Sequence, residues 1–138
     1  MGANRVFLDT NVLVYIYSDD EALKQNKAKF ALTNNKCVIN TQVLTEFSNI
    51  AFKKLHLSSP EINKIVDTLS NACSVLNVDI AILHKAINIK DRYGYSFYDS
   101  LVITSALECG CTYLYSEDMS DGQRIGNLII RNIFLGAE

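Results

Sequence analysis

Short, mostly apolar runs alternate with longer segments of helical periodicity along this chain. The runs are four or five residues long, which is typical of buried strands, and they cover residues 5–9, 37–40, 112–116 and 128–131. Between them, apolar side chains recur three and four positions apart, so helices are expected over residues 10–33 with a break at 18–21, 41–56, 59–73, 79–94 and 96–110. Strands that alternate with helices predict an α/β fold, a parallel sheet with helices on both faces.

Capping residues support several of these helix boundaries. Thr41 and Asp79 can accept hydrogen bonds from the first free N–H groups of the helices that they precede. Ser96 and Asp99 have the spacing of a capping box. Gly94 is expected to end the helix before it, because glycine adopts the left-handed conformation that closes many helices.

The length and composition restrict the class of protein. A chain of 138 residues predicts a single domain over 1–138, and 49% hydrophobic with 20% charged residues is typical of a folded globular protein. The longest apolar run, 12–17, is far shorter than the ~20 residues that span a bilayer, and no export signal precedes it. We therefore expect a soluble, cytoplasmic protein without a membrane partner.

The charge and the cysteines argue against two kinds of site. A net charge of −2 does not favour nucleic-acid binding through a basic surface alone, so chemistry on a phosphate would need a cation from elsewhere. Cys109 and Cys111 have the spacing of half a zinc site, but no second pair completes it. We expect buried free thiols at the four cysteines, Cys37, Cys73, Cys109 and Cys111.

Four of the 15 acidic residues adjoin apolar segments, where a carboxylate is costly unless it is paired or binds a metal. Asp9 ends the first strand, and Asp118 follows the third. Glu46 and Asp99 lie beside apolar faces of their helices. Taken singly, each has an ordinary explanation: a turn residue, a loop acid, a glutamate at the edge of a helix face, or a helix-capping aspartate.

Together, these four residues predict an acidic cleft. In open α/β sheets, ligands bind beyond the carboxyl ends of the strands, where two of the acids lie and near which the helices of the other two begin. Several like charges in one cleft repel one another, and a hard divalent cation such as Mg²⁺ or Mn²⁺ removes that conflict. Such a cluster is suited to metal-assisted displacement at phosphorus, in which the ion activates a water.

The same residues lie in segments that resemble a known family. The segments are VFLDTNVL at 6–13, Glu46 in the second strand–helix unit, FYDSL at 97–101 with ALECGC at 106–111, and LYSED at 114–118. In this order, over essentially the whole chain, they resemble PIN-domain ribonucleases and, more narrowly, the VapC-type toxins of bacterial toxin–antitoxin pairs. The resemblance implies a three-layer α/β/α fold with a central, mostly parallel sheet. It also implies a Mg²⁺- or Mn²⁺-dependent endoribonuclease that acts on RNA, forms a homodimer and is inhibited by a cognate antitoxin.

The resemblance assigns roles to individual residues. The family's four acids, which act as catalytic residues and metal ligands, correspond to Asp9, Glu46, Asp99 and Asp118. Asn11 matches the polar residue that orients the first carboxylate, and Ser116 matches the small hydroxyl two residues before the fourth acid. Thr10 adds a further polar group at the end of the first strand.

The last part of the site has more than one candidate acid. Glu117 lies beside Asp118, and Asp121 follows three residues later in a glycine-containing loop. Either residue is able to supplement or replace Asp118, and Asp121 is a further candidate metal ligand.

Two other classes of protein fit part of this pattern. A haloacid-dehalogenase-like phosphatase also has an aspartate at the end of its first strand, but it needs a second aspartate two residues later as general acid. Asn11 occupies that position here and cannot donate and recover the proton. The other alternative is a PIN-like interaction module without activity, against which the presence of all four acids argues. A metal-titrated RNA cleavage assay separates the three.

Overall fold

A six-stranded sheet forms the centre of the computed structural model, which describes residues 4–136. Its strands lie in the order β3-β2-β1-β4-β6-β5. They are β1 (Arg5–Leu8), β2 (Lys36–Asn40), β3 (Ser74–Leu76), β4 (Tyr113–Tyr115), β5 (Arg124–Ile125) and β6 (Leu128–Arg131). Neighbouring strands are parallel except β5, which pairs antiparallel with β6. The predicted mostly parallel sheet is confirmed.

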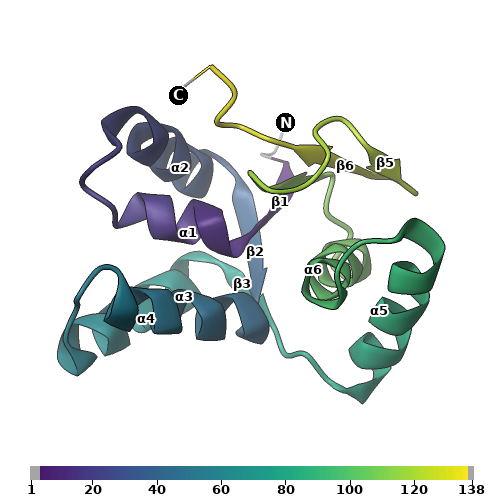
Figure 1. The fold of residues 1–138 in the computed structure, drawn as a ribbon, viewed down its shortest axis with the longest axis horizontal. Helices are drawn as coiled ribbons and strands as arrows, with labels where there is room; N and C mark the ends of the chain where they lie inside the picture. The colour runs from purple at the N-terminus through teal and green to yellow at the C-terminus, as the bar shows by residue number, and fades with distance from the viewer. Residues whose placement is uncertain (1–3, 137–138) are drawn as a thin grey trace.

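Helices cover both faces of this sheet (Figure 1). One layer contains α1 (Thr10–Ile16), α2 (Ala22–Asn34), α3 (Thr41–Lys53) and α4 (Ser59–Ala72). The other contains α5 (Ile80–Tyr93) and α6 (Phe97–Glu108), which pack against each other. The expectation of a three-layer α/β/α fold is therefore confirmed. No helix among the described residues is long and apolar enough to cross a membrane.

Side-chain caps define most of the helix starts. Asp79 accepts a hydrogen bond from the Ile82 N–H at the start of α5, and Gly94 ends that helix with a φ of 76°, as the sequence predicts. At α3 the expectation was wrong by one residue, because Asn40 rather than Thr41 caps the helix. The Asn40 side chain accepts from the backbone of Val43, three residues into the helix, where a capping oxygen is needed.

The core lies on both sides of β1. Val6, Phe7 and Leu8 have no exposed surface, because the helical layers cover both faces of this central strand. This double burial explains why the strand has a continuous apolar run instead of alternating polar and apolar residues. The cysteines of the described chain are free, and all but the partly exposed Cys109 are buried, as expected.

Two strands were not predicted. They are β3 and β5, which have three and two residues. Segments this short show no periodicity, and they are strands only because β2 and β6 lie beside them.

The order of the strands places a topological switch point between β1 and β4. The chain adds β2 and β3 on one side of β1 and then returns to add β4 on the other side. The helices that follow β1 cover one face of the sheet and the helices that precede β4 cover the other, so a crevice is expected at the carboxyl ends of these two strands.

Candidate active site

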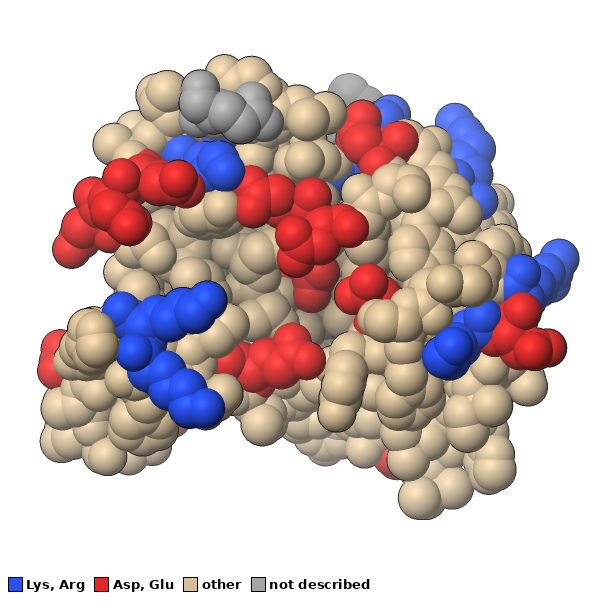
Figure 2. Space-filling view, in the orientation of Figure 1, with Lys and Arg blue, Asp and Glu red and all other residues tan. Residues whose placement is uncertain are grey.

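A pocket of about 350 Å³ lies at this switch point. It is lined by all four predicted acids and by residues of α1 and the end of α3: Asp9, Thr10, Asn11, Val14, Tyr15, Glu46, Ile50, Lys54, Asp99 and Asp118. The acids come from β1, α3, α6 and the loop after β4, which are separated by up to 109 positions in sequence. Figure 2 shows acidic side chains gathered around a hollow at the centre of one face of the molecule.

Asp9 lies at the back of the pocket, where β1 ends and α1 begins. Its backbone N–H donates to the Tyr115 carbonyl of β4, which holds the two strand ends together. One carboxylate oxygen, Oδ1, accepts from the Thr10 N–H at 2.8 Å and caps α1. The other, Oδ2, accepts from the Ser116 hydroxyl at 2.8 Å. Asp9 is therefore fixed in position by both of the strands that form the switch point.

The environment of Asp9 disfavours its ionised form. Only 7% of the residue is exposed, and this burial raises the pKa of its carboxyl group to about 6. The hydrogen bonds from Ser116 and Thr10 lower the pKa, while the charges of Asp99 and Glu46 add to the increase. The protein therefore maintains a carboxylate here at a cost in folding free energy, which a cation in the pocket would offset.

Glu46 and Asp99 approach the pocket from opposite layers. Glu46 lies on α3, where its Oε2 accepts from the Thr10 hydroxyl and its Oε1 accepts from the Gln42 amide, both at 2.8 Å. Asp99 lies in the first turn of α6, where its N–H donates to the capping Ser96 hydroxyl. The pKa of the Asp99 carboxyl group is raised, mainly by burial. A hydrogen bond with Ser96 lowers this pKa, and the charges of Asp118 and Glu46 raise it further.

Asp118 reaches the pocket from the loop after β4. Its Oδ2 accepts from the Asn11 amide at 3.1 Å, and its N–H donates to the Ser116 hydroxyl at 3.3 Å. The expectation that Asn11 orients the first carboxylate is not met, because the Asn11 side chain binds Asp118 and the Glu117 N–H. Asp9 is oriented by Thr10 and Ser116 instead.

The other two candidate acids lie outside the pocket. The carboxylate of Glu117 accepts hydrogen bonds from Tyr15 and Lys24. Burial raises the pKa of Glu117, but these hydrogen bonds outweigh it and bring the pKa below its usual value. Asp121 accepts from the backbone N–H of Asn132 and so joins the turn before β5 to the segment that follows β6. Asp118 is the acid of this segment that lines the pocket.

The pocket carboxylates have no ion-pair partner among residues 4–136. In the described part of the chain, no lysine or arginine nitrogen lies within 4.0 Å of the carboxylates of Asp9, Glu46, Asp99 or Asp118. Lys54 lines the pocket without contacting an acid, and basic side chains lie over α3 and α4 beside the hollow (Figure 2). The pocket thus combines uncompensated negative charge inside with positive charge at its margin.

The donor set of the pocket suits a hard divalent cation. Within residues 4–136, no three His, Cys, Asp or Glu side chains are arranged to hold a metal ion by themselves. Mg²⁺ does not require such a cage, because it keeps several water ligands and binds through one or two carboxylates together with substrate phosphates. The pocket carboxylates have no basic partner among the described residues, and burial raises the pKa of two of them, Asp9 and Asp99, so they fit that mode of binding.

Two residues that line the pocket and have recognisable spacing were not assigned to the site from the sequence. Lys54 lies eight positions after Glu46, with Ile50 between them, so all three share one face of α3. Tyr15 lies four positions after Asn11 on α1 and shares its face. This periodicity was visible in the sequence, but it carries information only once one member of each set is known to face a site.

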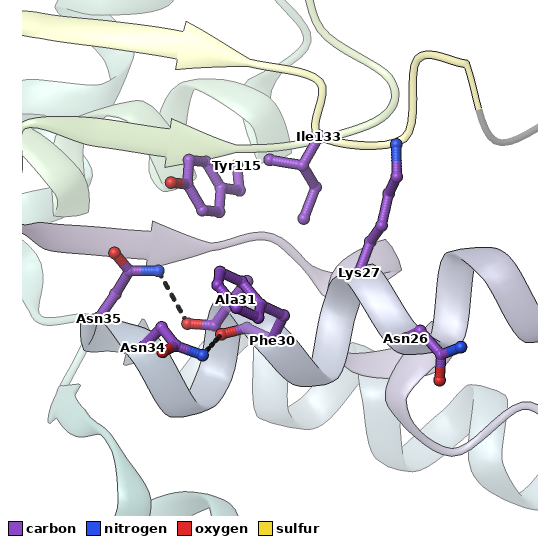
Figure 3. A pocket seen from close by; sticks show the side chains of 8 residues that line it. All are labelled: Asn26, Lys27, Phe30, Ala31, Asn34, Asn35, Tyr115 and Ile133. Atoms are coloured by element: carbon purple, nitrogen blue, oxygen red, sulfur yellow. Dashed lines mark hydrogen bonds between the residues drawn. The ribbon is translucent and has the colours of Figure 1, made fainter.

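A second, larger groove contains no comparable chemistry. It measures about 700 Å³ and lies between α2 and the strands β4 and β6, with Phe30, Ala31, Tyr115 and Ile133 among its walls (Figure 3). The amides of Asn34 and Asn35 at its rim donate to carbonyls within α2. Because no carboxylate, histidine or thiol lines this groove, the acidic pocket is the better candidate for an active site.

Comparison with known proteins identifies the class. The model of the PIN domain family matches residues 6–120, a span that includes all four pocket acids, and the chain belongs to this family. The match excludes the haloacid-dehalogenase-like alternative. Among curated proteins, none matches this chain.

Solved structures share the fold at low sequence identity. A toxin–antitoxin complex from Klebsiella pneumoniae matches with 20% identity and a TM-score of 0.70, over 90% of this chain and 95% of that chain. DNA-bound VapBC from Salmonella typhimurium matches with 19% identity and a TM-score of 0.67, over 94% and 98%. The sarcin–ricin loop cleaving toxin VapC20 of Mycobacterium tuberculosis matches with 17% identity and a TM-score of 0.64, over 79% and 86%. The chain therefore has the fold that these proteins share.

Proposed function

We propose that this PIN-domain protein is a divalent-metal-dependent endoribonuclease and the toxin of a toxin–antitoxin pair. The observation that carries the proposal is the convergence of four carboxylates in one pocket at the switch point of the sheet, where no basic side chain of the described residues pairs with them. The family membership and the fold shared with toxin–antitoxin proteins support it.

Asp9, Glu46, Asp99 and Asp118, which all line the pocket, would hold a Mg²⁺ or Mn²⁺ ion together with its water ligands. When bound, such an ion supplies an activated water and stabilises the leaving oxygen at phosphorus. The substrate phosphate would complete the ion's ligands, which is how Mg²⁺ is commonly held in phosphoryl-transfer sites.

The protein's own groups position the carboxylates for this role. Ser116 and the Thr10 backbone fix the two oxygens of Asp9, so the first acid needs little rearrangement when an ion arrives. The Thr10 hydroxyl and Gln42 fix Glu46 in the same way. Holding reactive groups in place before the reaction lowers the reorganisation that the chemical step requires.

The partners follow from the same proposal. The substrate is RNA, the inhibitor is a cognate antitoxin protein, and the toxin acts as a homodimer. Light scattering of the purified protein at micromolar concentration is expected to give the mass of a dimer, and the mass of a monomer would contradict that part of the proposal.

An RNA cleavage assay tests the proposed activity. Purified protein, titrated with Mg²⁺ or Mn²⁺, is expected to cut single-stranded or loop RNA and to leave 5′-phosphate and 3′-hydroxyl ends, as attack by an activated water would. EDTA and the substitution Asp99→Asn should each abolish cleavage. Expression of the wild type should arrest growth, and expression of Asp99→Asn should not.

Three results would overturn the proposal. Cleavage that persists in EDTA would exclude the metal, and ends that carry a 2′,3′-cyclic phosphate would exclude attack by water. An absence of cleavage on any RNA, together with no response to Mn²⁺, would favour a PIN-like interaction module without activity.

A further inference from the structure

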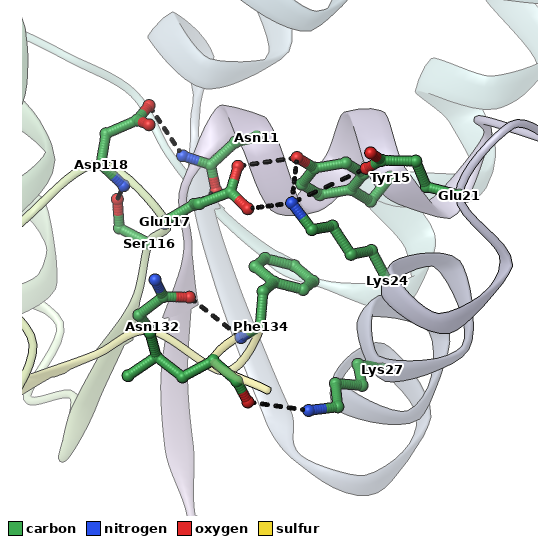
Figure 4. A network of polar contacts seen from close by, with 11 residues as sticks. Asn11, Tyr15, Glu21, Lys24, Lys27, Ser116, Glu117, Asp118, Asn132 and Phe134 are labelled. Carbon is green, nitrogen blue, oxygen red and sulfur yellow. Dashed lines mark hydrogen bonds and ion pairs between the residues drawn. The ribbon is translucent and has the colours of Figure 1, made fainter. Parts of the chain in front are cut away.

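The loop after β4 is anchored through Glu117, the acid that the pocket does not use. The Glu117 Oε1 accepts from the Tyr15 hydroxyl at 2.7 Å, and its Oε2 accepts from the Lys24 ammonium group at 2.7 Å (Figure 4). Lys24 also donates to the Tyr15 oxygen at 3.2 Å. Each pair within this group of three is therefore hydrogen-bonded, and the group joins the loop to both α1 and α2.

This group is more shielded than an ordinary surface ion pair. The side chains of Lys24 and Glu117 are only 12% and 25% exposed. The Lys24 ammonium also lies 5.0 Å from the centre of the Tyr15 ring, within the range of a cation–π contact. Shielding from water and a second hydrogen-bond partner strengthen an ion pair that would contribute little on an open surface.

The anchor is directly connected to a pocket acid. The Glu117 N–H donates to the Asn11 side-chain oxygen at 3.3 Å, and the amide nitrogen of Asn11 donates to Asp118 at 3.1 Å. Asn11 and Tyr15 are four residues apart on α1, so one face of this helix contacts both the Glu117 side chain and the Asp118 carboxylate.

We infer that Glu117 is a positioning residue and not a metal ligand: with Tyr15 and Lys24 it fixes the segment that presents Asp118 to the pocket. The inference rests on the proposed function for its consequences in metal binding and catalysis, while the anchoring itself is a property of the metal-free protein. Lys24, which lies outside the pocket and has no role in the proposed chemistry, thereby acts on the site through Glu117.

Substitution of Lys24 separates positioning from metal ligation. If Glu117 positions the loop, Lys24→Met releases the loop and weakens Mn²⁺ binding by roughly 10-fold, the lower end of what loss of a supporting contact costs a metal site. If Glu117 were a metal ligand, Lys24→Met would free its carboxylate, and Mn²⁺ binding would be unchanged or tighter. Lys29→Met, an exposed lysine on the same helix, controls for the loss of a positive charge.

Substitutions at Glu117 itself provide a second test. Glutamine can still accept from Lys24 and donate to the Tyr15 oxygen, so Glu117→Gln should retain most of the Mn²⁺ affinity and cleavage rate that Glu117→Ala loses. A metal ligand would show a large loss in both variants. Because Lys24 acts through Glu117, adding Lys24→Met to Glu117→Ala should cost little more, whereas independent roles would give additive losses.

Amide hydrogen exchange on the metal-free protein tests the anchoring of the loop directly. Lys24→Met is expected to speed exchange at the Glu117 and Asp118 N–H groups at least ~10-fold relative to wild type, whereas Lys29→Met leaves it unchanged, because exchange reports local opening. Unchanged exchange in Lys24→Met overturns the positioning role. Faster exchange in a protein that cleaves no RNA supports the positioning role and contradicts the proposed nuclease function, so the two ideas fail separately.

Discussion

Replacing Asp9 with asparagine tests the electrostatic cost of the pocket. Asparagine has nearly the same shape, is an equally good helix cap, and can still accept from the Thr10 N–H. Its amide nitrogen can donate to the Ser116 oxygen, which lies 2.8 Å from the carboxylate oxygen that it replaces. The substitution therefore removes the charge and leaves the packing nearly unchanged.

The expected effect follows from the pKa of Asp9, which burial raises from 3.8 in the unfolded chain to about 6 in the folded protein. Below pH ~4 the carboxyl group is protonated in both states and costs nothing. Between pH ~4 and pH ~6 the carboxyl group ionises in the unfolded chain before it ionises in the folded protein. The free energy of unfolding therefore falls as the pH rises, by about 3 kcal/mol in total above pH ~6. Asp9→Asn removes this cost, but it also removes the carboxylate that accepts from the Ser116 hydroxyl. The free energy of unfolding of Asp9→Asn should therefore exceed that of the wild type by roughly 1–3 kcal/mol at pH 7.5.

Denaturation in EDTA at several pH values between 4 and 8 measures this difference. For a chain of this length, the expected gain raises the melting temperature of Asp9→Asn by roughly 3–10 °C at pH 7.5 and by little near pH 4. Asp67→Asn, at an exposed position on α4, controls for the change in net charge. A variant that is less stable than wild type at pH 7.5, or a difference that does not depend on pH, would refute the reasoning.

Three further predictions concern the metal, the carboxylate of Asp99 and the end of α5. Mn²⁺ at a hundredfold excess over its dissociation constant should stabilise the wild type by about 2.7 kcal/mol and Asp9→Asn clearly less in thermal denaturation; equal gains would place the metal elsewhere. Asp99→Asn should lower the RNA cleavage rate at least ~100-fold. Its metal-free melting temperature should stay unchanged or rise, because burial and the charges of Asp118 and Glu46 disfavour the ionised group. A lower melting temperature would indicate a capping role for Asp99. Gly94→Ala should destabilise the protein by about 1–2 kcal/mol in urea, because residue 94 has a φ of 76°, and an unchanged midpoint would contradict this.

Most of the fold could be predicted from the sequence, because the hydrophobic periodicity and the capping residues agree with the tertiary structure. The apolar run that ends at Asp9 predicted the central strand. Asp79 begins α5 through its capping side chain, and Gly94 ends the helix through its left-handed backbone conformation. The exceptions are informative. Asn40 caps α3 in place of the neighbouring Thr41 because the position of the backbone decides which of two suitable side chains faces the free N–H groups. The strands β3 and β5 depend on their neighbours and have no periodicity of their own.

The sequence alone also predicted an acidic site, since carboxylates beside apolar segments are costly unless they are paired or bind a metal. Only the tertiary structure decided which acid after β4 enters the pocket. The family resemblance favoured Asp118, which follows Ser116 by two residues, but the acidic side chains of Glu117 and Asp121 lie within three residues of it and were also suited to the site. Whether each acid enters the pocket depends on hydrogen-bond partners from distant parts of the chain. Lys24 binds Glu117 from 93 positions away, and Asn11 binds Asp118 from 107 positions away. Hydrogen bonds and ion pairs act over only a few ångströms, and these distances are set by the tertiary structure. The tertiary structure therefore decides that Asp118, and not Glu117 or Asp121, lines the pocket.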